Sequence, residues 1–171
     1  MMKQTATVST FFAVLLLAAS CAKKETGPPP TATSLIGLTK AELVAQFGEP
    51  DDARQSAPGV EGLLFDKGGM RLNASVQDGQ VINVIVPMAS SLKLDTGIGY
   101  ASSLVEVTRI YGDFGSTQDI QGDMKGSDYS ARTLYHDTKT DKYKLRYDDP
   151  PLLFYFDANK KVHVFSVGRH M

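Results

Sequence analysis

Residue types that commonly carry out catalysis or bind metals are sparse in this sequence. Its three histidines are His136, His163 and His170. No two of them stand four residues apart, the spacing that would place two metal ligands on one face of a helix. The pattern therefore predicts no metal site and no bound cofactor, and it favours structural or solvated roles for these histidines.

Two pairs of adjacent aspartates, Asp51-Asp52 and Asp148-Asp149, are candidates for acid–base pairs, but their spacing argues against that role. Adjacent side chains on an extended chain point to opposite sides. Both pairs also flank prolines, so turns are the simpler interpretation. Gly97-Ile98-Gly99 lacks the third glycine of a phosphate-binding loop, and no Gly-x-Ser-x-Gly motif occurs. We therefore expect no catalytic residues and no enzyme activity.

The chemistry that the sequence does predict is covalent modification of Cys21. This residue is the only cysteine, and it follows the apolar run Phe11–Ala19 after a single early charge, Lys3. The run is long enough for the apolar region of a signal peptide and too short to span a bilayer as a helix. Small residues precede the cysteine, as a signal peptidase requires. We predict that residues 1–20 are a signal peptide cleaved between Ser20 and Cys21.

The segment Leu17-Ala18-Ala19-Ser20-Cys21 resembles the lipobox of bacterial lipoproteins, with Ala18 where the commonest form has leucine. The resemblance implies that Cys21 carries two or three acyl chains, palmitate among them, which hold a membrane stably where one chain binds only marginally. Ala22 and Lys23 follow the cysteine, and no aspartate stands there. By the same resemblance, this favours the periplasmic side of the outer membrane over the inner membrane.

The segment after the cysteine is polar and rich in proline, so we expect residues 21–34 to be a lipidated, flexible tether. The folded part would then begin near residue 35 and is long enough to bury a core without disulfide or metal. The chain has 18 basic and 19 acidic side chains, a net charge of −1. A nucleic-acid partner is not expected, because it would need a concentrated basic face.

The folded part contains an internal repeat. Thr39-Lys40-Ala41-Glu42 and Ser103-Leu104-Val105-Glu106 both fit a capping box, in which a hydroxyl and a glutamate three residues later cap the start of a helix. Each predicted helix ends at a glycine, Gly48 or Gly112. Caps and glycines share one offset, since 39 to 103 and 48 to 112 are both 64 residues. The repetition predicts two short helices at equivalent places in two repeats.

Three strands are predicted after each helix. In the first repeat they are Gly62–Asp66, Met70–Val76 and Val81–Val86, with Asp78-Gly79 favouring a type I′ turn. In the second repeat they are Lys142–Tyr147, Leu152–Asp157 and Val162–Val167. The strands are offset by about 82 residues instead of 64, so the second repeat carries an insertion of about 18 residues within 115–141. Arg132–His136 in that insertion is a candidate for an extra edge strand.

A helix followed by strands, taken twice, predicts an α+β fold with an antiparallel sheet and the helices packed on one face. The repeats would cover residues 35–88 and 96–171. Ile36–Pro50 resembles the opening motif Gly-x-Thr-x-x-x-Val-x-x-x-x-Gly-x-Pro of BamE-like small outer-membrane lipoproteins. The tandem arrangement is similar to the β-lactamase-inhibitor-protein-like (BLIP-like) proteins. The second repeat departs from the motif, with Phe114 where the first has Pro50.

The last hairpin holds the candidate binding residues. Pairing Phe156 with Val162 would leave one set of side chains under the helices and the other set exposed on the sheet, where it could bind a partner. The candidate interaction face consists of two cross-strand pairs, Tyr155 with His163 and Leu153 with Phe165. In the alternative arrangement, the insertion covers this face or the face packs against the other repeat.

Three functions follow from these expectations. The first is a membrane-anchored periplasmic lipoprotein that acts as a non-enzymatic protein-interaction module, with the BamE-like resemblance implying outer-membrane assembly or maintenance. The alternative is a carrier of a small ligand or lipid, with a cavity of several hundred cubic ångströms between sheet and helices lined by Phe47, Tyr111 and Phe154. A third, β-lactamase inhibition, rests on fold analogy alone.

Overall fold

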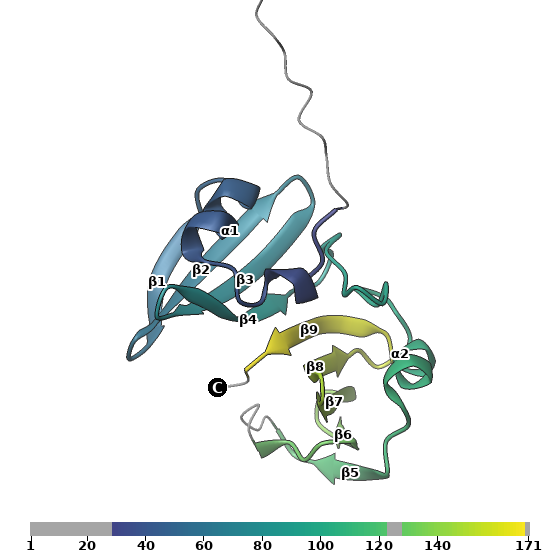
Figure 1. Ribbon diagram of the computed structural model, residues 1–171. Helices are drawn as coiled ribbons and strands as arrows, with labels where there is room; N and C mark the ends of the chain where they lie inside the picture. Colours follow the sequence, from purple (N-terminus) through teal and green to yellow (C-terminus); the bar gives the residue numbers. More distant parts are fainter. Residues whose placement is uncertain (1–28, 123–127, 170–171) are drawn as a thin grey trace, which may run out of the picture.

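The first predicted helix forms where its cap indicates. The computed structural model describes residues 29–122 and 128–169 (Figure 1) and places α1 at Lys40–Phe47. The backbone N–H of Glu42 donates to Thr39 Oγ1 at 3.2 Å, and the N–H of Thr39 donates to the Glu42 carboxylate at 2.8 Å. The helix ends at Gly48, whose φ of 80° suits a residue without a Cβ. The predicted signal peptide, Cys21 and residues 22–28 lie outside the described residues.

The second helix repeats this arrangement. α2 spans Leu104–Tyr111 and is capped by Ser103 and Glu106, with the corresponding hydrogen bonds at 3.2 and 2.6 Å. Gly112 ends it at a φ of 91°. The two helices and their caps are therefore confirmed, because capping depends on four consecutive residues and little on their surroundings.

The strands form one nine-stranded mixed sheet in the order β1-β2-β3-β4-β9-β8-β7-β6-β5. All neighbours are antiparallel except β5 and β6, which are parallel. The strands are β1 (Asp52–Ala57), β2 (Val60–Lys67), β3 (Met70–Gln77), β4 (Gln80–Val86), β5 (Ser116–Ile120), β6 (Thr133–Asp137), β7 (Lys142–Asp148), β8 (Pro151–Phe156) and β9 (Val162–Gly168).

The two repeats share this sheet. The last strand of each repeat, β4 or β9, pairs with the other at the centre, from Val86 opposite Phe165 to Asn83 opposite Gly168 (Figure 1). The fold is thus α+β, with two helices and a single mixed sheet. The sequence predicted a purely antiparallel sheet, and the parallel pair β5–β6 departs from that expectation.

Each repeat is closed by the same backbone contact. The N–H of Val81, near the start of β4, donates to the Leu38 carbonyl at 2.8 Å. The N–H of Val162, at the start of β9, donates to the Ser102 carbonyl at 2.7 Å. In both repeats the accepting residue directly precedes the helix cap, so the start of the helix is joined to the last strand of its own repeat.

Two edge strands were not predicted. β1 and β5 are exposed along almost their whole length, and neither shows an alternation of apolar and polar residues. Their pairing rests on backbone hydrogen bonds, which leave no pattern in the sequence. The predicted extra edge strand at Arg132–His136 forms as β6, but it is interior, because β5 pairs along its outer side.

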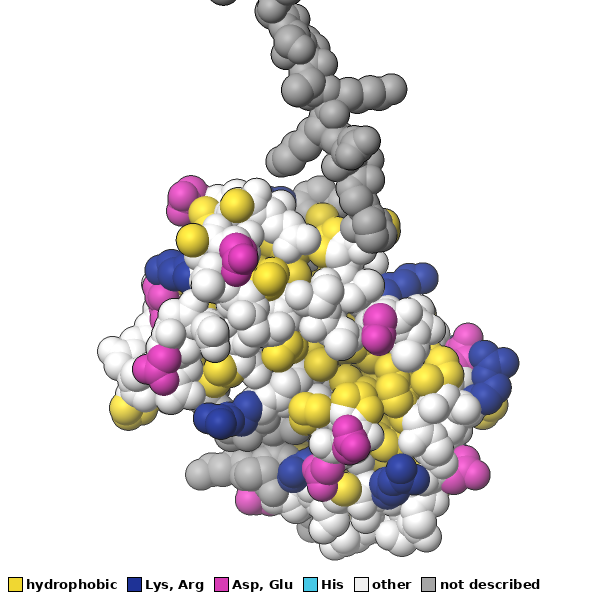
Figure 2. Space-filling model, viewed as in Figure 1, with side chains coloured by type: hydrophobic (Ala, Val, Ile, Leu, Met, Phe, Trp, Pro, Cys, Tyr) yellow, Lys and Arg dark blue, Asp and Glu magenta, His cyan; other side chains and the backbone are white. Residues whose placement is uncertain are grey.

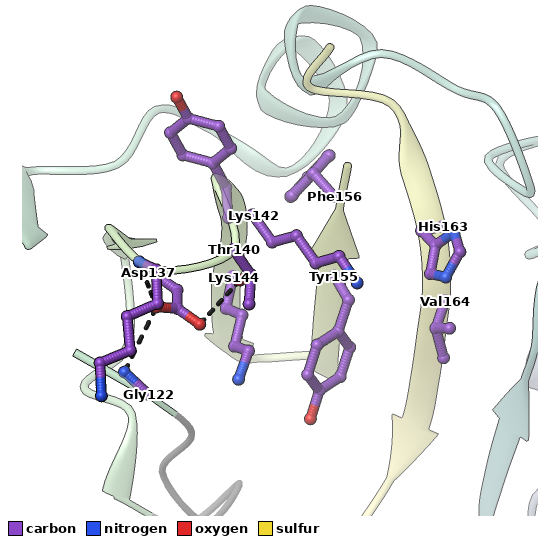
Figure 3. Close-up of a pocket in the computed structure, with 11 residues that line it drawn as sticks. Gly122, Asp137, Thr140, Lys142, Lys144, Tyr155, Phe156, His163 and Val164 are labelled. Atoms are coloured by element: carbon purple, nitrogen blue, oxygen red, sulfur yellow. Dashed lines mark hydrogen bonds between the residues drawn. The ribbon is translucent and has the colours of Figure 1, made fainter. Parts of the chain in front are cut away.

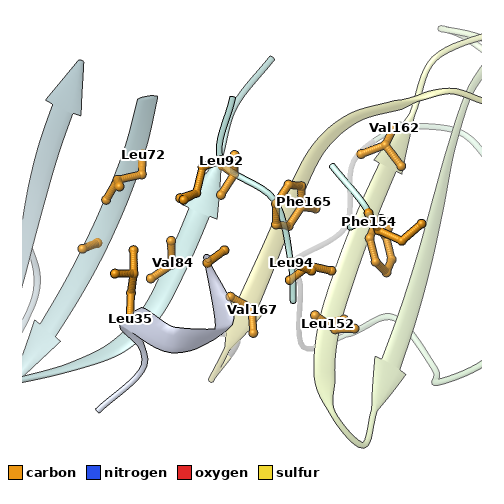
Figure 4. Close-up of a cluster of buried hydrophobic side chains, with 14 of the residues drawn as sticks. Leu35, Leu72, Val84, Leu92, Leu94, Leu152, Phe154, Val162, Phe165 and Val167 are labelled. Carbon is orange, nitrogen blue, oxygen red and sulfur yellow. The ribbon is translucent and has the colours of Figure 1, made fainter. Parts of the chain in front are cut away.

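Both helices pack on one face of the sheet, and the segments between them complete the same core. The short 3-10 helix Thr33–Leu35 and the linker residues Leu92 and Leu94 cover the central strands β4 and β9 (Figure 4). Ala32 and Leu35 are fully buried, and the N–H of Ala32 donates to the Lys93 carbonyl at 2.8 Å. The expectation that the tether extends to residue 34 is therefore wrong, because the folded part already includes Ala32.

Charged side chains are interspersed over the surface visible in Figure 2, with Lys and Arg lying among Asp and Glu. No concentrated basic face appears in this view, which agrees with the net charge of −1. Among the described residues, neither helix has the length and apolar character needed to cross a bilayer.

Candidate functional site

The register of the last hairpin differs from the prediction. Phe156 pairs with Val162 as expected, but Tyr155 pairs with Val164 and Leu153 pairs with Ser166. His163 is the extra residue of a β-bulge. Because side chains alternate between the two faces, one extra residue moves every later residue of β9 to the opposite face. The predicted pairs of Tyr155 with His163 and of Leu153 with Phe165 are therefore wrong.

The bulge separates the four predicted face residues. Phe165 lies in the core under the helices, with its ring centroid 6.2 Å from that of Phe154. Leu153 is on the opposite face, called the open face below, but it is only 3% exposed. Tyr155 and His163 are partly exposed and remain near each other.

The insertion covers part of the open face, as the alternative arrangement anticipated. Tyr129 is 1% exposed and packs edge-on against Tyr135, with ring centroids 5.0 Å apart. The N–H of Ser130 donates to the Tyr135 hydroxyl at 2.9 Å, and Arg146 donates to the Tyr129 carbonyl at 2.9 Å. These contacts bury Leu153 in a small second cluster with the two tyrosines.

Lys144 is buried between the ring of Tyr129, from the insertion, and the ring of Tyr155, on β8. Its ammonium donates to the Tyr129 hydroxyl at 2.8 Å and lies 5.2 Å from the ring centroids of both Tyr129 and Tyr155. The ammonium lies at the hydroxyl edge of Tyr129, whereas the ring of Tyr155 attracts the cation through its quadrupole, most strongly where water is excluded. The side chain of Lys144 is thus held in place where the insertion ends and the rest of the open face begins.

Beside this cover lies a cavity of about 440 Å³, which we call the basic groove (Figure 3). It crosses β7, β8 and β9, and the turn between β6 and β7 forms one wall. Its main lining residues are Asp137, Lys139, Thr140, Lys142, Lys144, Tyr155, Phe156, His163 and Val164. Of the predicted candidates, Tyr155 and His163 line this groove; the lysines were not predicted.

The charge of the groove is positive. Asp137 accepts hydrogen bonds from Thr140 Oγ1 at 2.7 Å and from the N–H groups of Lys139 and Gly122 at 3.0 and 3.3 Å. These bonds, chiefly that from Thr140, hold the pKa of Asp137 below its ordinary value. Its carboxylate therefore stays charged and already accepts hydrogen bonds from its own turn. Three lysines against this one aspartate leave the lining with a net positive charge.

Two of the lysine ammonium groups are not engaged. Within residues 29–122 and 128–169, neither Lys139 nor Lys142 forms a side-chain ion pair. Figure 3 shows the side chain of Lys142 extending from β7 toward Tyr155, while His163 and Val164 project from β9. The groove therefore offers cations and apolar surface together, and it can bind an anionic group that carries an apolar part.

A histidine outside the groove lies between two carboxylates. The two ring nitrogens of His136 lie 3.1 Å from an Asp119 oxygen and 3.0 Å from an Asp141 oxygen, and its ring stacks on Tyr143. The hydrogen bonds to Asp141 and then Asp119 raise its pKa above the ordinary value. No group of three or more potential metal ligands converges among the described residues.

The aromatic residues proposed to line a carrier cavity pack against other rings. Phe47 contacts Phe65, with centroids 5.7 Å apart, and Tyr111 contacts Phe154, with centroids 5.9 Å apart. Phe154 is fully buried. None of the three predicted cavity residues lines the basic groove, which lies on the other face of the sheet.

Comparison with known proteins identifies relatives in fold and none in sequence. No protein-family model and no curated protein sequence matches the chain. An extracellular protein containing an SCP domain from Bacillus anthracis has a similar structure, with a TM-score of 0.58 and 17% identity over 85% of this chain and 48% of that one. A cysteine-rich secretory protein from Staphylococcus aureus has a TM-score of 0.54 and 13% identity over 83% of this chain and 47% of that one.

This chain spans about half the length of those two proteins, and at such identities the similarity establishes the fold alone. A candidate β-lactamase inhibitor protein from Streptococcus mutans aligns with 76% of this chain and 82% of its own at 14% identity. Its TM-score of 0.31 is too low to support a functional argument. The chain is thus similar in fold to parts of bacterial proteins described as extracellular or secretory.

Proposed function

We propose that this chain is a non-enzymatic binding module, held outside the cytoplasm by an acyl anchor on Cys21, that engages a protein partner through the basic groove. The observation that carries the proposal is the makeup of the groove. It places Lys139 and Lys142, which have no ion pair among the described residues, beside the apolar surface of Tyr155 and Val164, on the sheet face without helices. Buried aromatic anchors beside complementary charge are typical of protein interfaces.

The location outside the cytoplasm is supported by two independent features. The lipobox-like segment ending at Cys21 is one, and the description of the two fold relatives as extracellular and secretory is the other. The resemblance of residues 36–50 to BamE-like lipoproteins extends the proposal to outer-membrane assembly or maintenance, on the periplasmic side. A non-enzymatic role is supported by the groove itself, whose one carboxylate is already bonded by its own turn.

Site-specific crosslinking tests the docking surface. A photoreactive benzoylphenylalanine replaces His163 in the groove, and in a matched strain it replaces Val105, which is 74% exposed on α2 on the other side of the sheet. We expect illumination of living cells to yield a protein adduct of one defined mass from position 163 and none from position 105. Adducts from position 105 alone, or from neither position, would contradict the proposal.

Labelling and fractionation test the anchor. Wild-type cells should incorporate radioactive palmitate into the protein and retain it in the outer-membrane fraction, because several acyl chains anchor stably. Cys21→Ser should remove the label and leave the protein in the signal-bearing precursor form. Recovery of unlabelled wild-type protein in the soluble fraction would rule out acylation of Cys21.

A small-ligand carrier is the second candidate, and the volume of the groove favours it. About 440 Å³ falls within the range of about 300–1,000 Å³ typical of small-molecule sites. Native mass spectrometry of protein released from cells would detect a bound small molecule as a defined mass increment. An increment that disappears in Lys142→Glu, without any crosslinked protein at position 163, would favour the carrier over the docking module.

A further inference from the structure

We propose that the basic groove recognises one kind of peptide segment: an extended stretch in which a carboxylate side chain and a large apolar side chain stand two residues apart. This inference rests on the proposed function, because it names the chemistry of the partner segment that docks there. It commits to a protein segment rather than to a lipid or a nucleic acid.

The cations of the groove select the carboxylate. Lys142 and Lys144 are two residues apart on β7, so both point to the open face. Lys144 is already bound between tyrosine rings, whereas Lys142 and Lys139 have no ion pair among the described residues. Lys139 and Lys142 are exposed, so a partner carboxylate gains from them the modest attraction of a surface ion pair.

Two acidic groups at the turn between β6 and β7 are held by other partners. Asp137 is bonded by Thr140 and by two backbone N–H groups of the turn. Asp141, on the same turn, contacts His136 at 3.0 Å. A ligand carboxylate therefore meets Lys142 without competition from an internal ion pair in the described part of the chain.

The apolar half of the site lies one and two strands away. Tyr155 on β8 and Val164 on β9 are cross-strand partners on the open face, and Phe156 also lines the cavity. Neighbouring strands are about 4.8 Å apart, so β7 and β9 are separated by about 9.6 Å. Residues i and i+2 of an extended peptide project to the same side, about 6.8 Å apart. Lys144 is the partner of Tyr155 and Lys142 is two residues away on the same strand, so a segment lying diagonally across the strands reaches Lys142 with one side chain and Tyr155 with the side chain two residues along.

The lining residues argue for a carboxylate over a phosphate. No arginine lines the groove, and lysine meets an anion as a point charge without the paired donors that suit phosphate. The lining N–H groups of Lys139 and Gly122 already donate to Asp137. The described lining therefore has neither the paired N–H donors of an arginine nor a cluster of free backbone N–H groups that would bind a phosphate.

Peptide titration tests this inference. The purified, anchored protein in detergent micelles is titrated with acetyl-Ala-Glu-Ala-Phe-Ala-amide, and amide shifts of the β7–β9 residues are followed by NMR. We expect the peptide with Gln in place of Glu to bind about fivefold more weakly, as suits a partly exposed ion pair. Lys142→Glu should reverse the preference, so that the peptide with Lys in place of Glu binds better. Lys93→Glu, an exposed lysine of the linker, is the matched control and should leave the preference unchanged.

Each outcome decides a separate point. Equal binding of the Glu and Gln peptides would overturn the acidic recognition, and the docking function would still stand if position 163 crosslinks to a protein. Selective peptide binding without any crosslink in cells would support the groove chemistry and overturn the protein partner. Shifts of the β7–β9 amides on adding phosphatidylglycerol to the micelles of the anchored protein that are lost in Lys142→Glu, with no peptide binding, would overturn the peptide in favour of a lipid surface.

Discussion

Removing the hydroxyl of Tyr129 should loosen the insertion from the open face. This hydroxyl accepts a hydrogen bond at 2.8 Å from the ammonium of Lys144, which is only 8% exposed. Tyr129→Phe keeps the ring and its edge-on contact with Tyr135, and it removes the acceptor. A hydrogen bond to a charged group contributes about 1.5–3 kcal/mol, so we expect the free energy of unfolding to fall by that amount.

Tyr129→Ala separates the contribution of the ring from that of the hydroxyl. The side chain is 1% exposed, and replacing a fully buried aromatic residue by alanine costs about 3–5 kcal/mol. The difference between the two variants measures the packing of the insertion on the sheet. Both are expected to unfold as single transitions, because Tyr129 contacts the strands rather than a separate unit.

Urea denaturation followed by far-ultraviolet circular dichroism provides the measurement. The matched control is Tyr100→Phe, because Tyr100 is 47% exposed and should change stability by less than about 0.5 kcal/mol. A Tyr129→Phe variant within about 0.5 kcal/mol of wild type would show that the hydroxyl does not stabilise the buried lysine. The account of the insertion as a fixed cover of the open face would then be wrong.

Three further predictions concern the caps, the histidine and the central strand pair. Thr39→Ala and Ser103→Ala should each lower the free energy of unfolding by about 1 kcal/mol in urea denaturation, with additive effects in the double variant because the two caps share no hydrogen-bond partner. The pKa of His136 is raised, so protonated His136 should stabilise the fold fully below the ordinary histidine pKa of about 6.5, and this stabilisation should be lost as the pH rises through the raised pKa. Melting temperatures measured between pH 5 and 9 should therefore fall with rising pH, and His136→Gln should remove this dependence. Gly168→Ala should lower the melting temperature more than Gly79→Ala does. Both glycines have a positive φ, but only at Gly168 would an added Cβ overlap a neighbouring carbonyl oxygen. Equal effects of the two substitutions would contradict this reasoning.

Features encoded by a few consecutive residues were predicted from the sequence. The capping boxes placed both helices, and the Asp78-Gly79 turn adopts φ values of 51° and 78°, as a type I′ turn requires. The core strands also followed from alternation, because each buries one face. The lipid anchor on Cys21 lies outside the described residues and remains a prediction from the same kind of local pattern.

Features that depend on residues distant in sequence were not predicted. β1 and β5 expose both faces, so no alternation marks them, and the interior position of β6 follows only from its pairing with β5. The contacts of His136 join residues of three separate segments. Such pairings arise from the geometry of the whole sheet, which no short stretch of the chain specifies.

The candidate site shows where local information ends. Residue spacing and the lack of motifs predicted no catalytic cluster, and the assumed register of the last hairpin made Leu153, Tyr155, His163 and Phe165 the candidates for binding. The tertiary structure decided the rest: the bulge at His163 turned Phe165 into the core, Tyr129 covered Leu153, and Lys142 came to face the cavity. The physical reason is that a strand residue's exposure depends on register and on what packs above it, and both are set by segments far away in the sequence.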